Sequence, residues 1–436
     1  MSDLIPSWRL RQRFTQRLSE MYRAEVPPYG VLVDLVEGIN TSAGGTEHSK
    51  HTRLGHERHG AIRLAAPEEL SLLRRALNVL GMQAVEYYDL GPAGLPVHST
   101  AFRPTTAKDI DMSAFRLFVS LVRLDQISSP ELRKTAMRLA RRRSILAPET
   151  LSLIAIAECN GGLTESEGDA LLTGLVETFR WRGEALCSKS DYDAIVSEHP
   201  LLADVLCFPN PHINHLTPSV IDIELAQADM ISKGLPAKDR IEGPPNRSCP
   251  ILLRQTSFQA MDETVHFTSN GTPSEAWKHT ARFGEIEERG AALTDKGMSL
   301  YSECLEKADF SRLPDDWETL RREGLAWFRY VPGPDYAPFS TPESVTSVSD
   351  LEPLIQAGVV QAEPITYEDF LPVSAAGIFR SNLGNTSHEP HCASGDRAEF
   401  EKSLGHQVLS AQILYRYEQN KSVQRLCQHE SVVENG

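Results

Sequence analysis

Apolar residues at the start of the chain recur at helical spacing. Over residues 7–25 they return every three or four positions, which places them on one face and predicts an amphipathic helix. The members of this face are Leu10, Phe14, Leu18 and Met21. Pro27 and Pro28 follow, so the helix is expected to end before them. The next apolar run, 30–36, is too short to assign to a helix or to a strand.

The pattern then changes to a strand–helix–strand–strand order. Residues 59–64 are expected to form a strand. The helix expected over 67–80 begins with a proline and two glutamates, which suit the first turn of a helix. Two further strands are expected over 82–90 and 97–104. The first hundred residues therefore predict one β-α-β-β module.

A related order returns after a long helical stretch. Residues 108–207 read as several helices and are expected to form a helical insertion. A strand over 212–217, a helix over 219–234 and strands over 251–258 and 283–289 follow. The two modules differ in sequence, but each opens with a strand that carries histidine. This similarity suggests an internal repeat.

Composition and charge narrow the class of protein. The chain has 436 residues, of which 41% are hydrophobic, and a net charge of −15. Nucleic acids and anionic membranes are bound by basic patches, so neither is an expected partner. The seven cysteines are scattered and form no CxxC pair, which favours a reducing compartment and predicts a cytoplasmic protein. We expect neither a membrane span nor a secretory signal, because no long apolar run is present.

Three short segments carry side chains that can bind a metal ion. They are ERHGAIR at 57–63, HINHLTP at 212–218 and FGEIEERG at 283–290. Each is expected on a strand, and together they offer imidazole and carboxylate groups. Two histidines and one carboxylate form the set that binds Fe(II) and leaves coordination positions open. If the three segments meet in space, the chain is a metal-dependent oxygen enzyme.

Strand alternation narrows the histidine candidates. His59 and Arg63 share one face of their strand, so a ligand and a cation would point into the same cavity. His212 and His215 lie on opposite faces if their strand is regular. Only one of these two is therefore expected to bind the metal, while the other packs or supports a ligand from outside.

Alternation leaves the carboxylate open. Glu285 and Glu287 share a face, so either can be the ligand, and both can instead form ion pairs with Arg289 across an exposed strand. The chain has 14 histidines, and most histidines in proteins are structural or exposed. Any one candidate taken alone is therefore better explained by packing than by metal binding.

The segments around these candidates resemble one known family. The resemblance is to the 2-oxoadipate dioxygenase/decarboxylase (2-hydroxyglutarate synthase) family, of the vicinal-oxygen-chelate superfamily. It is carried, in this order, by EVPPYGVLVDLV, ERHGAIR, YYDL with PVHSTAFRP, HINHLTP, EGPPNR, PILLRQTSF, HTARFGEIEERGAALT and YEDFLPVSAAGIFRSNLG. It implies an α+β fold in which two βαβββ modules form a half-barrel around a metal, with a helical insertion.

The resemblance implies roles for the candidates. The family's metal ligands fall on His59, His215 and Glu285, which selects one histidine and one glutamate from the pairs left open. His212 and Glu287 then become candidates for residues that support the ligands from outside.

The resemblance also implies a substrate and a reaction. The family's substrate-binding arginine falls on Arg63, and a further substrate contact falls on Val373. The implied activity is that of an Fe(II)-dependent oxidoreductase of lysine degradation. It decarboxylates and hydroxylates 2-oxoadipate with O2 and forms 2-hydroxyglutarate and CO2. Zinc or nickel can occupy such a site in a crystal, because affinity alone does not select iron.

Two other functions fit the same residues. An isomerase or lyase of the superfamily would use the metal as a Lewis acid, without O2. A non-catalytic binding protein would keep the fold alone, and the three intact ligand positions argue against it.

We expect the chain to be organised in four segments. Residues 1–107 hold the N-terminal helix and the first metal-binding module, and 108–207 hold the helical insertion. Residues 208–310 hold the second metal-binding module. Residues 311–436 complete the pocket and end in a frayed tail.

Overall fold

The computed structural model describes residues 4–43, 53–269, 272–335, 348–371 and 395–427. The chain divides into two compact units, and each of them draws on distant parts of the sequence. Unit 1 comprises Met1–Glu242, Arg254–Glu288 and Phe370–Leu409. Unit 2 comprises Gly243–Leu253, Arg289–Asp369 and Ser410–Gly436. The division into four segments that we drew from the sequence stays a prediction.

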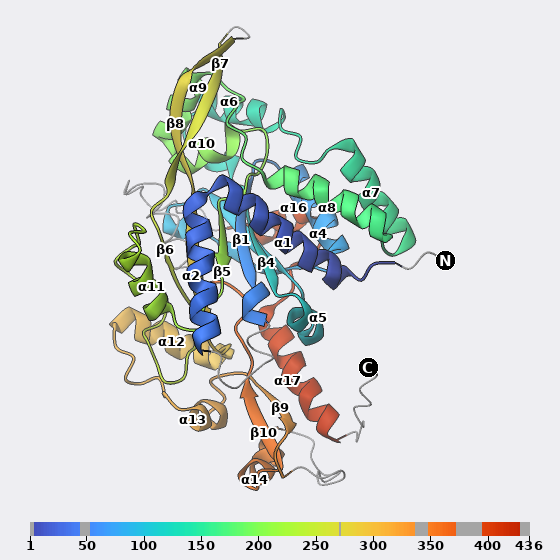
Figure 1. Cartoon of the computed structure of the whole chain (residues 1–436), viewed down its shortest axis with the longest axis vertical. Helices are drawn as coiled ribbons and strands as arrows, with labels where there is room; N and C mark the ends of the chain where they lie inside the picture. Colours follow the sequence, from blue (N-terminus) through green and yellow to red (C-terminus); the bar gives the residue numbers. More distant parts are fainter. Residues whose placement is uncertain (1–3, 44–52, 270–271, 336–347, 372–394, 428–436) are drawn as a thin grey trace. The chain divides into compact units, whose positions relative to one another are not determined.

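Unit 1 is built on a mixed, curled sheet in which the strands follow the order β2-β3-β4-β1-β5-β8-β6, with β7 paired to β8 (Figure 1). The bounds are β1 (Arg58–Leu64), β2 (Gln83–Asp89), β3 (Val97–Arg103), β4 (Phe115–Val122), β5 (His215–Pro218), β6 (Leu253–Ser257), β7 (Met261–Ser269) and β8 (Thr272–Arg289). The expected α+β class with a half-barrel sheet is confirmed.

Two βαβββ modules make up this sheet. The first runs β1, α4 (Pro67–Val79), β2, β3, β4, and the second runs β5, α11 (Ile223–Ser232), β6, β7, β8. β1 is parallel to β4, and β5 is parallel to β8 in the same way. β1 and β5 join the modules in antiparallel register, with His59 opposite Thr217 and Ala61 opposite His215. This register relates the modules by a local twofold axis and gives His59 and His215 equivalent positions.

The helical insertion begins later than we expected. β4 lies inside the range 108–207 that we predicted to be helical, so that prediction is wrong for these residues. Its sequence, FRLFVSLV, is buried along its whole length, and a continuous apolar run cannot be assigned by periodicity alone. The helices of this region are α5 (Ala107–Met112), α6 (Pro130–Ala140), α7 (Pro148–Asn160), α8 (Glu165–Phe179), α9 (Lys189–Glu198) and α10 (Pro200–Leu206), with 3-10 turns η1 (Gly91–Ala93) and η2 (Leu124–Gln126) nearby.

The second module contains a hairpin that the sequence pattern did not reveal. β8 begins at Thr272, eleven residues before the expected strand at 283, and pairs with β7 from Met261↔Arg282 outwards. Figure 1 shows the two strands extending together away from the rest of the sheet. Polar residues dominate this part of β8, so no apolar alternation marks it.

Two N-terminal helices cover β1, β4 and β5 (Figure 1). The expected apolar face of α1 (Ser7–Glu25) is buried. The unassigned run 30–36 is helical and belongs to α2 (Pro27–Ala43). A proline suits the first turn of a helix, so Pro27 separates α1 from α2 and also begins α2. The Tyr22 hydroxyl of α1 donates to the carbonyl oxygens of Asn214 and Phe283, at 2.9 and 2.7 Å, and so ties both strands of the second module to α1.

Unit 2 contains a two-stranded antiparallel sheet, β9 (Phe328–Pro332) and β10 (Val360–Pro364). Its helices are α12 (Asp295–Lys307), α13 (Trp317–Arg322), α14 (Glu352–Gln356), α17 (Ala411–Cys427) and the 3-10 turn η3 (Val348–Leu351). α17 packs on β9 through the hydroxyl of Ser422, which accepts from the Tyr330 N–H at 2.9 Å. The expected frayed tail is therefore wrong up to Cys427, where the helix ends.

The remaining helix, α16 (Arg397–Leu404), belongs to unit 1 and packs against α4. None of the helices in the described ranges is long and apolar enough to cross a bilayer.

Candidate metal centre

Strands β1, β5 and β8 bring three predicted ligands together. His59, His215 and Glu285 each offer one ligand atom, and these atoms lie within 4.8 Å of one another. Their relative exposures are 1%, 7% and 0%. Within the described ranges, no other group of three such side chains comes this close. Two imidazole nitrogens and one carboxylate oxygen are a donor set that a divalent transition metal prefers, so the residues fit such an ion.

The local twofold axis explains why the site has three ligands. On β8, Glu285 stands two residues beyond the partner of His215. On β4, the residue two positions beyond the partner of His59 is Phe118. Glu285 and Phe118 are therefore equivalent by the twofold. Because a phenylalanine cannot bind a metal, the repeat supplies three ligands and leaves an apolar side chain in the fourth position.

An aromatic wall adjoins this fourth position. The Phe370 ring lies 5.1 Å from the ring of Phe118 and 5.1 Å from that of His59, measured between centroids. The Phe370 N–H donates to the Tyr88 hydroxyl at 3.2 Å, which holds the chain here. Val373, which we predicted as a substrate contact, follows three residues later and lies outside the described residues.

Each ligand is oriented by a neighbour. The Nδ1 of His59 lies 2.8 Å from a Glu287 oxygen, which leaves its Nε2 on the side of Glu285, at 4.0 Å from the carboxylate. The Nδ1 of His215 lies 3.0 Å from the Thr217 hydroxyl and 3.2 Å from Glu285. The amide of Gln255 donates to the second Glu285 oxygen. Hydrogen bonds of this kind fix the tautomer and orientation of metal ligands.

Burial also sets the protonation of this site. Desolvation, together with the positive charges of His59 and Arg63, holds the pKa of His215 well below its ordinary value. Removing a side chain from water disfavours its charged form, so the His215 ring is neutral at physiological pH. A neutral ring is the state that binds a metal.

Arg63 lies on the same face of β1 as His59, as the alternation predicted. Its guanidinium forms a buried ion pair with Asp204, and the two side chains have relative exposures of 3% and 2%. Glu57, the acid that we considered as an alternative partner, instead pairs with Arg116 at 2.7 Å. Arg63 therefore stands between the metal ligands and an acid of helix α10.

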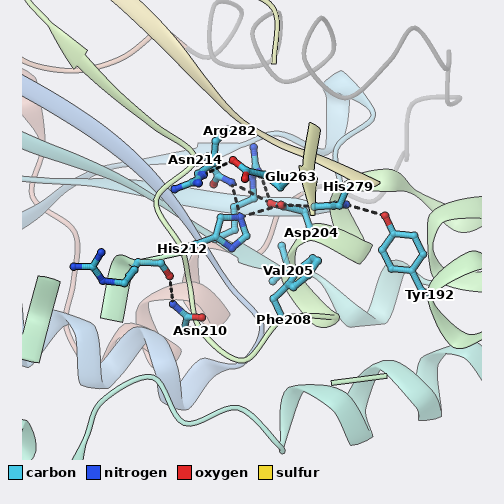
Figure 2. A network of polar contacts seen from close by, with 12 residues as sticks. Tyr192, Asp204, Val205, Phe208, Asn210, His212, Asn214, Glu263, His279 and Arg282 are labelled. Carbon is cyan, nitrogen blue, oxygen red and sulfur yellow. Dashed lines mark hydrogen bonds and ion pairs between the residues drawn. The ribbon is translucent and has the colours of Figure 1, made fainter. Parts of the chain in front are cut away.

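His212 does not join the metal ligands. Its Nε2 lies 3.1 Å from Asp204, and its ring packs edge-on against Trp181 with centroids 4.6 Å apart. Figure 2 shows His212 directed at Asp204, on the side away from the metal group. Of the two histidines in HINHLTP, one thus stands beside Glu285 and the other supports Asp204.

Several residues of this region escaped the sequence analysis. They are Phe118, Asp204, Gln255 and Phe370. Two of them carried a usable signal, because Asp204 is the one charged residue in the apolar stretch PLLADVL and Gln255 interrupts an apolar strand. A buried polar side chain needs a partner, so each marks a position worth testing. The two phenylalanines look like ordinary core residues.

The fold and the buried histidine–carboxylate group define a metal-binding protein with paired βαβββ modules. A glyoxalase superfamily protein from Ralstonia eutropha JMP134 shares this fold at a TM-score of 0.53 and 21% identity, over 66% of this chain and 87% of that chain. The chain belongs to the 2-oxoadipate dioxygenase/decarboxylase family, whose model matches residues 14–382.

Individual relatives match over nearly the whole chain. The 2-oxoadipate dioxygenase/decarboxylase of Escherichia coli K12 is 42% identical, over 98% of this chain and 99% of the relative. The crystal structure of the hydroxyglutarate synthase from Pseudomonas putida in complex with 2-oxoadipate has 40% identity and a TM-score of 0.87, over 98% of this chain and 99% of that chain.

Proposed function

We propose that this chain is an Fe(II)-dependent dioxygenase that converts 2-oxoadipate and O2 into 2-hydroxyglutarate and CO2. The observation that carries the proposal is the buried group of His59, His215 and Glu285, with its fourth position closed by Phe118. Membership of the family, and a relative crystallised with 2-oxoadipate, support the choice of substrate.

The three ligands would hold the iron, which supplies a cationic centre for the 2-oxo acid and the redox chemistry that O2 activation needs. Zinc has no redox chemistry, so iron suits an oxygen reaction better. One carboxylate against a divalent ion leaves a net positive charge, which attracts an anionic substrate. Gln255 holds one oxygen of Glu285, which favours binding through the other.

The remaining residues would position the substrate. Arg63 is planar and permanently charged, so it can bind the distal carboxylate through parallel hydrogen bonds. Phe118 and Phe370 form an apolar surface against which the aliphatic carbons can pack. We also propose Val373 as a substrate contact, and Glu287 and His212 as residues that support His59 and Asp204.

Oxygen uptake tests this proposal directly. Protein loaded with Fe(II) under anaerobic conditions should consume O2 on addition of 2-oxoadipate and release CO2 with 2-hydroxyglutarate. His59→Ala, His215→Ala and Glu285→Ala should each abolish this reaction, because a site with two ligands cannot hold the metal in its working geometry. His406→Ala, at an exposed histidine, is the matched control and should keep full activity.

Two outcomes would contradict the proposal. Turnover of 2-oxoadipate without O2 uptake would indicate the isomerase or lyase alternative, and binding without turnover would indicate a binding protein. Full activity in any one ligand variant would remove that residue from the metal site.

We further propose that the protein acts in the cytoplasm, in lysine breakdown. The described cysteines Cys159, Cys187, Cys207, Cys249 and Cys304 are free thiols, which fits a reducing compartment. Cells that lack the gene should accumulate 2-oxoadipate when fed lysine. Unchanged 2-oxoadipate levels would contradict this assignment.

A further inference from the structure

We propose that Asp204, carried by the helical insertion, is the residue that positions Arg63 and thereby sets which 2-oxo acids the site accepts. This inference rests on the proposed role of Arg63 in substrate binding. It gives the helices between the two modules a function, because α10 carries Asp204 into the neighbourhood of the metal ligands.

The Asp204 carboxylate is fully engaged (Figure 2). One oxygen accepts hydrogen bonds from the Nε2 of His212 at 3.1 Å and the Nε2 of His279 at 3.0 Å. The other accepts from the Arg63 guanidinium and from the Asn214 amide, the latter at 3.2 Å. A carboxylate has about four acceptor sites, so this one is held in a single orientation from four directions.

The network reaches a second helix of the insertion. The Tyr192 hydroxyl of α9 lies 2.8 Å from the Nδ1 of His279, as Figure 2 shows. If this hydroxyl donates, the His279 proton is placed on Nε2, where it meets Asp204. His279 lies on β8, six residues before Glu285. Helices α9 and α10 are therefore fastened to the strand that carries the predicted carboxylate ligand.

The charges in this network define how Arg63 can select a substrate. Burial alone would raise the pKa of Asp204, but the charges of His212 and Arg63 and the hydrogen bonds from the histidines hold it well below its ordinary value. Asp204 is thus ionised and offsets much of the Arg63 charge. Attraction by net charge is weakened, so Arg63 favours a carboxylate that reaches its remaining donors in the right place.

Selection by position implies selection by chain length. The metal ligands would hold one end of a 2-oxo acid, and Arg63 would hold the other at a distance fixed by Asp204. An acid one methylene shorter or longer would miss one of these anchors. A misplacement of about 1 Å at such a site can cost about 100-fold in rate.

The test compares two acids of equal length on Asp204→Asn, a change that keeps the shape of the side chain and removes its charge. 2-Oxoadipate carries a distal carboxylate, and 2-oxohexanoate carries a methyl group in its place. Dissociation constants are measured by calorimetry on protein loaded with redox-inert zinc, and KM and kcat on the iron form. We expect about 10- to 100-fold weaker binding and a higher KM for 2-oxoadipate. 2-Oxohexanoate should change by less than about twofold.

Equal losses for both acids would show that Asp204 acts only on the fold, and no loss for either would show that it does not position Arg63. The preference for 2-oxoadipate over the acids one carbon shorter and one carbon longer should also fall in Asp204→Asn. An unchanged preference would overturn the inference on chain length.

Arg63→Ala separates this inference from the proposed function. If Arg63→Ala does not weaken 2-oxoadipate more than 2-oxohexanoate, the substrate role of Arg63 fails. If Arg63→Ala shows that difference and Asp204→Asn does not, the positioning role of Asp204 alone fails. In the double variant the two losses should not add, because both changes remove the same contact.

His279→Gln keeps the test decisive if Asp204→Asn does not fold. This change removes one of the four hydrogen bonds to Asp204 and leaves its ion pair with Arg63 in place. It should weaken 2-oxoadipate by a smaller factor and leave 2-oxohexanoate unaffected. His266→Gln, on the neighbouring strand β7, is the matched control and should change neither acid. A His279→Gln protein that binds both acids as the wild type does would contradict the inference.

Discussion

His59 shows how one residue of the site is prepared for a metal. Glu287 binds its Nδ1, and the edge of its ring meets Phe370. Both contacts turn Nε2 towards Glu285 and leave little freedom for the ring. A carboxylate behind a histidine also raises the basicity of the ligand. The residues around the ligands thus determine the ligand geometry before any metal binds.

Histidine burial makes stability depend on pH, and His98 is the clearest case. Desolvation, reinforced by the charge of Arg123, lowers the pKa of His98 from 6.5 to about 4. The unfolded chain takes up this proton near pH 6.5 and the folded protein only near pH 4. Between these values the unfolded state binds more protons, so stability falls as the pH falls.

The size of this effect can be measured by denaturant unfolding between pH 7 and pH 4.5. His98 should contribute at most about 1.4 kcal/mol for each pH unit below 6.5. His98→Gln cannot take up a proton, so its stability should decline less steeply over this range. Parallel curves for the two proteins would contradict the assignment of His98 as a buried neutral residue.

The strands that carry the ligands are fixed by glycines beside them. Gly60 follows His59 on β1, and Gly284 precedes Glu285 on β8. A Cβ atom at Gly60 would come within 2.7 Å of Ile213, and one at Gly284 within 2.1 Å of the Phe258 ring. Because side chains alternate across a strand, each ligand faces one side while its glycine permits close packing on the other.

Gly284→Ala should therefore destabilise the protein and disturb the metal site. Phe258 is 1% exposed, so its ring has little room to move away from an added methyl group. We expect a loss of about 1–3 kcal/mol in the free energy of unfolding. The metal should also bind more weakly, because β8 carries Glu285. Denaturant unfolding and metal titration measure the two effects.

Gly38→Ala is the matched control for this substitution. Gly38 is exposed on helix α2, and a Cβ atom there would meet nothing within 4 Å. Alanine is the better helix former, so this change should stabilise the protein by about 0.5–1 kcal/mol. If Gly284→Ala behaved like the control, close packing behind Glu285 would not matter.

At the scale of the whole molecule, the metal site joins parts of the chain that are far apart in sequence. His59 and His215 come from different modules, and the insertion that separates them supplies Asp204. Such a site does not exist in the unfolded chain, so metal binding stabilises the folded state. The long separations also make the site depend on correct assembly of both modules.

Metal should consequently raise the melting temperature. A divalent ion at 100 times its dissociation constant should add about 2.7 kcal/mol to the stability of unit 1. Protein stripped by a chelator should melt at a lower temperature and recover when the ion is returned, as thermal unfolding measures. Glu285→Gln should lose this response, while Glu306→Gln, at an exposed position, should retain it. A full response in Glu285→Gln would argue against Glu285 as a ligand.

The sequence by itself determined the local features of this protein. The periodicity of the apolar residues located α1, α4 and the histidine strand β1, because such patterns depend only on neighbours along the chain. Alternation placed Arg63 on the face of His59 for the same reason. It could not separate Glu285 from Glu287, which share a face, and it missed β4 and the β7–β8 hairpin, which have no distinct pattern.

Only the tertiary structure decided which distant groups meet. Register between β5 and β8 sets Glu285 beside His215, while Glu287 turns to the outer nitrogen of His59. The twofold relation puts Phe118 in the fourth position, and the fold of the insertion brings Asp204 to Arg63. These contacts join residues up to 228 positions apart. Pairing between distant strands and helices arises from packing over the whole unit, which no local pattern encodes.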